Sequence, residues 1–145
     1  MDIYYKPISE SGKQMINYVC KYAPVELFKG FGQECAVLEE MPENFDKSDK
    51  IAHANLCGFG KSVIQAVLEG KVEGLVLVNC CDSMRRVYDI IENTKKCKFL
   101  YMLDLPHEDN ECENIKFAQS IIRLKNAYER YSHRTFDREL FIKSF

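Results

Sequence analysis

The amino-acid sequence predicts an α/β domain in which a mostly parallel sheet of about four strands carries helices on both faces. Two observations support this fold class. Segments with helical periodicity alternate with short β-rich segments along the 145 residues, an order typical of parallel sheets. Two of the β-rich segments, residues 75–78 and Phe99–Leu103, are also continuous apolar runs. Strands covered on both faces have this pattern, whereas half-exposed antiparallel strands alternate.

The first half of the chain predicts four elements before residue 50. The first is a helix over residues 9–20, with Met15, Ile16 and Val19 at helical spacing, and the second is a short helix from Val25 to Phe28 that is closed by Gly30 or Gly32. A strand over residues 35–38 follows. The last is an acidic surface loop over residues 39–49 that starts a helix near Phe45. Pro24 separates the first two, because proline interrupts a helix.

The second half gives stronger signals. A helix follows Cys57, with Val63, Ile64, Val67 and Leu68 on one face and Gly70 at its end. After the strand at residues 75–78, Asp82 is expected to cap a helix carrying Met84, Val87, Tyr88 and Ile91. After the strand Phe99–Leu103, Asn110 with Glu113 predicts a capped helix, followed by a last helix near Phe136. The face predicted for the helix after Asn110 comprises Ile115, Ala118, Ile121, Ile122, Lys125 and Tyr128.

Composition excludes several classes of function. The chain is 46% apolar and 29% charged with a net charge of −2, which is globular composition without the basic stripe that nucleic acids require. No apolar run approaches the ~20 residues of a membrane span, and the first residues lack the features of a secretory signal. These features predict a cytoplasmic protein. Its seven cysteines are expected to be reduced, and the odd number excludes complete internal pairing.

Three cysteines occupy informative positions. Cys80 and Cys81 directly follow the strand at residues 75–78, and Cys57 heads a glycine-containing helix start. Ligands of open α/β sheets bind beyond the carboxyl ends of strands, where helix N-termini stabilise thiolates. This placement favours metal ligation by Cys57, Cys80 and Cys81, although reduced core cysteines remain an alternative. The other cysteines are interpreted as structural: Cys20, Cys35, Cys97 and Cys112.

The segment Gly58-Phe59-Gly60-Lys61-Ser62 offers a second interpretation, a nucleotide-binding loop. Asn55 stands where the phosphate-loop pattern requires its first glycine, and the preceding residues make a poor strand. Both departures weaken that alternative.

Taken together, the motifs resemble those of the 2-hydroxyacyl-CoA dehydratase family, which includes benzoyl-CoA reductase subunits and double-cubane cluster proteins. The matching segments are Tyr22-Ala23-Pro24-Val25-Glu26-Leu27 with Gly30 and Gly32, Cys57-Gly58-Phe59-Gly60-Lys61-Ser62, Gly74-Leu75-Val76-Leu77-Val78-Asn79-Cys80-Cys81-Asp82, and Asp104-Leu105-Pro106. The resemblance implies flavodoxin-like domains and an iron–sulfur cluster, either 4Fe–4S or a double cubane. It also implies an ATP-dependent activator that supplies an electron, with lyase or reductase activity on an acyl-CoA or a small substrate.

The resemblance also assigns site residues. Cys57 matches the first cluster ligand, Cys81 matches the second, and Cys80 is a natural extra ligand of the double-cubane type. Five neighbours are expected at the cluster edge, namely Gly58, Gly60, Ser62, Asn79 and Asp82.

Family subunits are longer and carry a further ligand in a second domain, so the resemblance implies a fragment, a truncated reading frame or one half of a split subunit. The expected organisation is a helical segment at residues 1–33, the α/β domain at 34–135, and the start of an inter-domain helix at 136–145. The expected partners are a complementary domain or subunit and the activator, with self-association as a further alternative. A non-enzymatic remnant or interaction module that has lost its cluster is the competing hypothesis.

Overall fold

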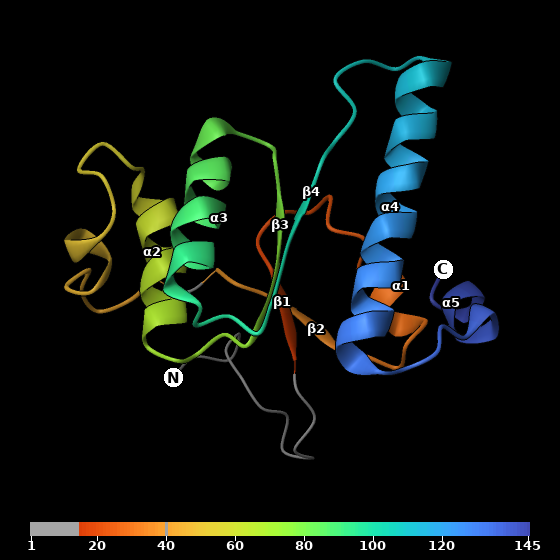
Figure 1. Cartoon of the computed structure of the whole chain (residues 1–145), viewed down its shortest axis with the longest axis horizontal. Helices are drawn as coiled ribbons and strands as arrows, with labels where there is room; N and C mark the ends of the chain where they lie inside the picture. The colour runs from red at the N-terminus through yellow and green to blue at the C-terminus, as the bar shows by residue number, and fades with distance from the viewer. Residues whose placement is uncertain (1–14, 40) are drawn as a thin grey trace.

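A computed structural model describes residues 15–39 and 41–145 (Figure 1). Its four strands form one parallel sheet in the order β2-β1-β3-β4. The strands are β1 (Ile16–Tyr18), β2 (Cys35–Val37), β3 (Gly74–Val78) and β4 (Phe99–Leu103). Helices α2 (Gly58–Leu68) and α3 (Asp82–Thr94) lie on one side of the sheet, whereas α1 (Val25–Lys29), α4 (Glu111–Ser132) and α5 (Arg138–Lys143) lie on the other. The predicted three-layer α/β fold is confirmed.

Strand β1 corrects the prediction of a helix over residues 9–20. Residues 16–18 are extended and pair with both β2 and β3, while residues 9–14 lie outside the described part of the chain. The strand has only three residues, and its middle residue, Asn17, is polar yet 1% exposed. Its Nδ2 atom donates to the Ala36 carbonyl oxygen at 3.4 Å. The expected N-terminal helical segment therefore contains a central strand, and the division at residues 33 and 135 stays a prediction.

Strand β3 separates the two halves of the hydrophobic core. All five of its residues are buried, and successive side chains of a strand point to opposite faces. Leu75 and Leu77 pack with residues of α2 and α3, whereas Val76 packs with α1, β4 and α4. The continuous apolar run in the sequence is thus explained by burial on both faces.

The ends of the helices follow the sequence with one exception. Asn110 caps α4, since its side chain accepts a hydrogen bond from the Glu113 N–H at 2.9 Å. The predicted cap at Asp82 is wrong, because α3 begins at Asp82 and the N-cap residue is Cys81. Cys81 has the extended backbone that an N-cap position requires, and Asp82 instead supplies negative charge to the first turn of the helix.

Helix α4 buries the predicted face only in part: Tyr128 is buried and half-buried Ile121 packs against the core, but the centre of the buried stripe is Leu124. Its buried residues are Ser120, Leu124 and Tyr128, whereas Ile115 and Ile122 are 53% and 55% exposed. Ile115 and Ile122 are seven residues apart and therefore lie on the same face of the helix. At 3.6 residues per turn, this face is roughly opposite the one that carries Leu124. A helix that packs on only one layer buries one such stripe.

The loop before α2 contains a short 3-10 helix (Ser48–Lys50), labelled η1, where a helix start near Phe45 was expected. Gln65 of α2 holds this loop. Its Oε1 atom accepts hydrogen bonds from the backbone N–H groups of Lys47 and Ser48 at 3.0 and 2.9 Å. Among the described residues, the helices are all too short or too polar to cross a lipid bilayer.

Candidate functional site

The central strands β1 and β3 mark a switch in the order of the sheet. The chain leaves β1 for β2 on one flank, and β3 then lies on the other flank. A crevice at the carboxyl ends of two such strands is the usual ligand site of open α/β sheets. Cys20 follows β1, and Cys80 with Cys81 follows β3. The structure therefore brings cysteines from two loops to the predicted edge.

Cys57 occupies the N-cap of α2 and is exposed. Its Sγ atom accepts a hydrogen bond from the Gly60 N–H at 3.4 Å. That backbone hydrogen bond, followed by one from the Ser83 hydroxyl, lowers the pKa of the Cys57 thiol. Ser83 lies in the first turn of α3, two residues after Cys81. The helix starts that carry Cys57 and Cys81 are thus in contact, as the sequence predicted for one shared edge.

Cys80 has a different environment from Cys57. Although Cys80 is exposed, partial desolvation of its thiol, together with charge and hydrogen bonding from the neighbouring thiols of Cys20 and Cys81, raises its pKa to about 11. Cys20 was interpreted as structural, but it contacts Cys80 at the edge of the sheet. The signal that could have revealed it is its position just after β1, which the prediction of a helix concealed.

The glycine-containing segment at the start of α2 serves the packing of the helix. A Cβ atom at Gly60 would stand 3.1 Å from Val87 Cγ2 and 3.2 Å from Leu56 Cγ, so glycine allows α2 and α3 to approach closely. The Ser62 hydroxyl donates to the Gly58 carbonyl oxygen at 2.9 Å, and Lys61 pairs with Asp49 at 3.1 Å. These contacts engage the two side chains that a phosphate loop would direct to its ligand.

Asn79 links the ends of β3 and β4. Its Nδ2 atom donates to Asp104 Oδ1 at 2.8 Å, and its Oδ1 atom accepts from the Leu105 N–H at 2.7 Å. The loop bearing Cys80 is therefore fixed to the loop that begins at Asp104. Asp82, another residue expected at this edge, is exposed at the start of α3.

The fit of these thiols to a metal cluster is partial. Cys57 and Cys81 are exposed thiols at the N-caps of two helices in contact, a setting suited to thiolate ligands. Within residues 15–39 and 41–145, however, no group of three or more His, Cys, Asp or Glu side chains is arranged to hold a metal ion. The described residues thus present two suitable donors, with Cys80 and Cys20 beside them.

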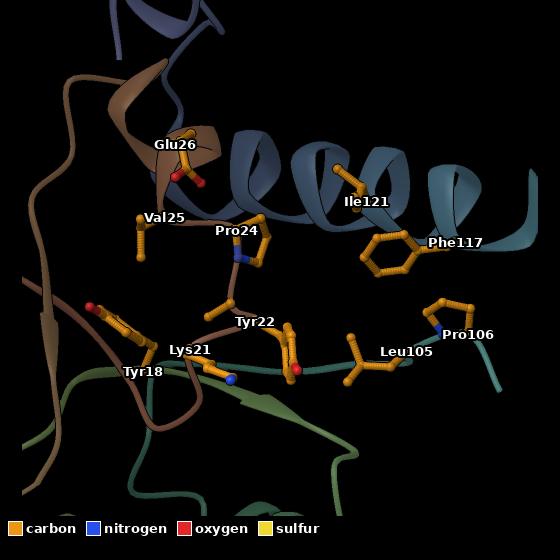
Figure 2. Close-up of a pocket in the computed structure, with 11 residues that line it drawn as sticks. Tyr18, Lys21, Tyr22, Pro24, Val25, Glu26, Leu105, Pro106, Phe117 and Ile121 are labelled. Carbon is orange, nitrogen blue, oxygen red and sulfur yellow. The ribbon is translucent and has the colours of Figure 1, made fainter. Parts of the chain in front are cut away.

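A cavity of about 790 Å³ lies at the same edge of the sheet. Figure 2 shows its walls, formed by the loop after β1, the loop after β4 and one face of α4. The lining is Tyr18, Lys21, Tyr22, Ala23, Pro24, Val25, Glu26, Leu105, Pro106, Phe117 and Ile121. Sequence reasoning missed this cavity, because its walls come from segments almost a hundred residues apart.

Comparison with known families gives a match over most of the chain. Residues 20–145 match the family model described as 2-hydroxyglutaryl-CoA dehydratase, D-component. The chain belongs to this family. The matched range contains Cys20, Cys57, Cys80 and Cys81. The suspected resemblance to the 2-hydroxyacyl-CoA dehydratases is confirmed at the level of the family. A search of curated proteins finds no match.

The two environments predict an order of thiol reactivity in this dehydratase-family chain. Only the thiolate is alkylated, and the pKa of Cys57 is lowered whereas that of Cys80 is raised to about 11. At pH 7, iodoacetamide should therefore modify Cys57 well before Cys80. The preference should shrink as the pH rises toward 11, because Cys80 then ionises. Peptide mass spectrometry of timed samples measures both rates, and faster labelling of Cys80 at pH 7 would contradict the assignment.

Proposed function

We propose that this chain is the cluster-holding part of a dehydratase D-component, with Cys57 and Cys81 as thiolate ligands of an iron–sulfur cluster. The observation that carries the proposal is the contact between the starts of α2 and α3, each with an exposed thiol at its N-cap. Membership of the dehydratase family supports it. A complementary domain or subunit supplies the remaining ligand, in keeping with the family's description as a component.

The chain's own residues have defined tasks in this proposal. The Gly60 N–H and the Ser83 hydroxyl stabilise the Cys57 thiolate, and hydrogen bonds to ligating sulfur are one means by which proteins tune a cluster. A cluster held by these residues would supply one-electron transfer between an ATP-dependent activator and an acyl-CoA. Cys80 is the additional ligand if the cluster is a double cubane. Its thiol would then have to ionise on binding, although its surroundings raise its pKa to about 11.

Anaerobic reconstitution with iron and sulfide tests the ligand assignment. The parent chain and the variants Cys57→Ser, Cys81→Ser and Cys80→Ser are compared alone and with a candidate second-domain chain. Cys112→Ser is the matched control, because Cys112 is an exposed cysteine in the first turn of α4. Iron content and visible absorbance should fall strongly for Cys57→Ser and Cys81→Ser and stay at the parent level for Cys112→Ser.

The outcomes separate the competing functions. Parent-level iron in Cys57→Ser and Cys81→Ser in both settings would refute the ligand assignment. A parent chain that stays iron-free in both settings would support the non-enzymatic interaction module instead.

A further inference from the structure

The cavity at the carboxyl edge has the size and composition of a small-molecule site. Its volume of about 790 Å³ lies within the range of roughly 300–1,000 Å³ usual for ligand pockets. Figure 2 shows Phe117 of α4 across the open space from Tyr22 and Leu105, and Ile121 of the same helix also lines the cavity. Most of the lining side chains are apolar or aromatic, so water inside gains few hydrogen bonds and an apolar group would displace it favourably.

The charged groups of the cavity are few. Lys21 is exposed, and its Nζ atom lies 5.1 Å from the centre of the Tyr22 ring. Glu26, half-buried, is the other charged residue in the lining. One ammonium group and one carboxylate suit a ligand with at most one charged end. A second carboxylate on that ligand would lose its hydration against Leu105 and Phe117, which is costly without a paired cation.

The cavity also adjoins the proposed cluster edge through two short connections. Cys20, which contacts Cys80, directly precedes Lys21 and Tyr22. On the opposite wall, Asn79 holds Leu105 through the hydrogen bond to its N–H, and Asn79 directly precedes Cys80. A molecule in the cavity would therefore lie beside the loops that carry the thiols.

We propose that this cavity binds the apolar side group, aryl or branched alkyl, of a small carboxylic acid derivative. In the assembled protein it sets the substrate class, favouring acids with an apolar tail over dicarboxylic acids; this role in the assembly rests on the proposed function. Phe117 and Ile121 contact the tail, Tyr22 covers it, and Lys21 faces the single carboxyl or acyl end.

A titration of the metal-free 145-residue chain tests the cavity itself. The probes are 3-phenylpropionate and glutarate, followed by ¹H–¹⁵N NMR spectra. Saturable shifts are expected with 3-phenylpropionate at the amides of Tyr22, Leu105 and Phe117. Glutarate has no apolar side group to bury in the cavity, so it should bind about tenfold more weakly or worse. Equal affinity for both probes, or shifts spread over other surfaces, would overturn the proposal.

Matched variants locate the binding. Phe117→Asp should weaken 3-phenylpropionate binding by about tenfold, whereas Ile115→Asp, at an exposed position on the same helix, should change it by less than about twofold. Tyr22→Ala is a second cavity variant at a mostly exposed position, so it tests the site even if Phe117→Asp fails to fold. Unchanged affinity in Tyr22→Ala and in a folded Phe117→Asp would overturn the assignment.

The two proposals fail separately. The titration contains no iron, so loss of probe binding leaves the result of the reconstitution unaffected. Conversely, a chain that binds 3-phenylpropionate but never iron would retain the cavity and lose only its link to dehydratase chemistry.

Discussion

Replacing Tyr128 with alanine should lower the free energy of unfolding by about 3–5 kcal/mol, the usual cost of deleting a large buried aromatic side chain. Tyr128 is 2% exposed and lies at the centre of an aromatic cluster. Its ring makes edge contacts with Phe28, Phe31 and Phe99 at centroid distances of 5.1, 4.9 and 5.4 Å. These partners come from α1, the loop after it and β4, so the substitution loosens the packing of α1 and α4 against the sheet.

Urea unfolding followed by far-ultraviolet circular dichroism measures this loss, since the chain has no tryptophan. Tyr128→Phe removes only the hydroxyl, which donates to Gln33 Oε1 at 2.9 Å, and should cost about 1 kcal/mol. Tyr22→Ala is the exposed aromatic control and should change stability by about 0.5 kcal/mol or less. The packing account fails if Tyr128→Ala costs no more than Tyr22→Ala.

Gln65→Leu should destabilise the chain by about 2 kcal/mol or more, although leucine has a similar size and is more apolar. Gln65 is buried and accepts hydrogen bonds from the N–H groups of Lys47 and Ser48. It also donates to Glu69 Oε1 at 2.8 Å. Leucine leaves both backbone donors without their acceptor; the Ser48 hydrogen bond is buried and that of Lys47 part-buried, and a buried donor without a partner costs about 1–3 kcal/mol.

The same unfolding experiment tests this prediction. The midpoint should move to lower urea with little change in slope, which indicates a loss of stability in the same folded state. Gln119→Leu is the matched control, because Gln119 is exposed on α4. Equal midpoints for the two variants would show that Gln65 does not hold the loop before α2.

The sequence predicted the two strands that are continuous apolar runs, β3 and β4. The expected burial on both faces holds for β3, whereas β4 is an edge strand that is buried only at Phe99 and Leu103. Strand β1 is as central as β3, but it has three residues with buried Asn17 in the middle. Ile16 and Val19 are three apart, a spacing typical of a helix. Pairing with β2 and β3 decided the conformation, and sequence periodicity carries no information on such non-local contacts.

The same cause limited the prediction of the site. Cys57 and Cys81 could be singled out from local sequence. Cys57 directly precedes a glycine-containing helix start, and Cys81 follows a clear strand. Cys20 could not, since its position after a strand was hidden by the error over β1. Local sequence also indicated a capping role for Asp82, whereas the backbone conformation gave that place to Cys81.

The close approach at Gly60 has a consequence for the two proposed ligand sulfurs. Cys57 and Cys81 are the N-cap residues of α2 and α3, and these helices meet where Gly60 faces Val87. The bite of this pair, meaning the span between its donor atoms, is therefore set by how deeply two helices interlock. A methyl group at residue 60 would push α2 and α3 apart, so it would change the distance between the two sulfur atoms without replacing either cysteine.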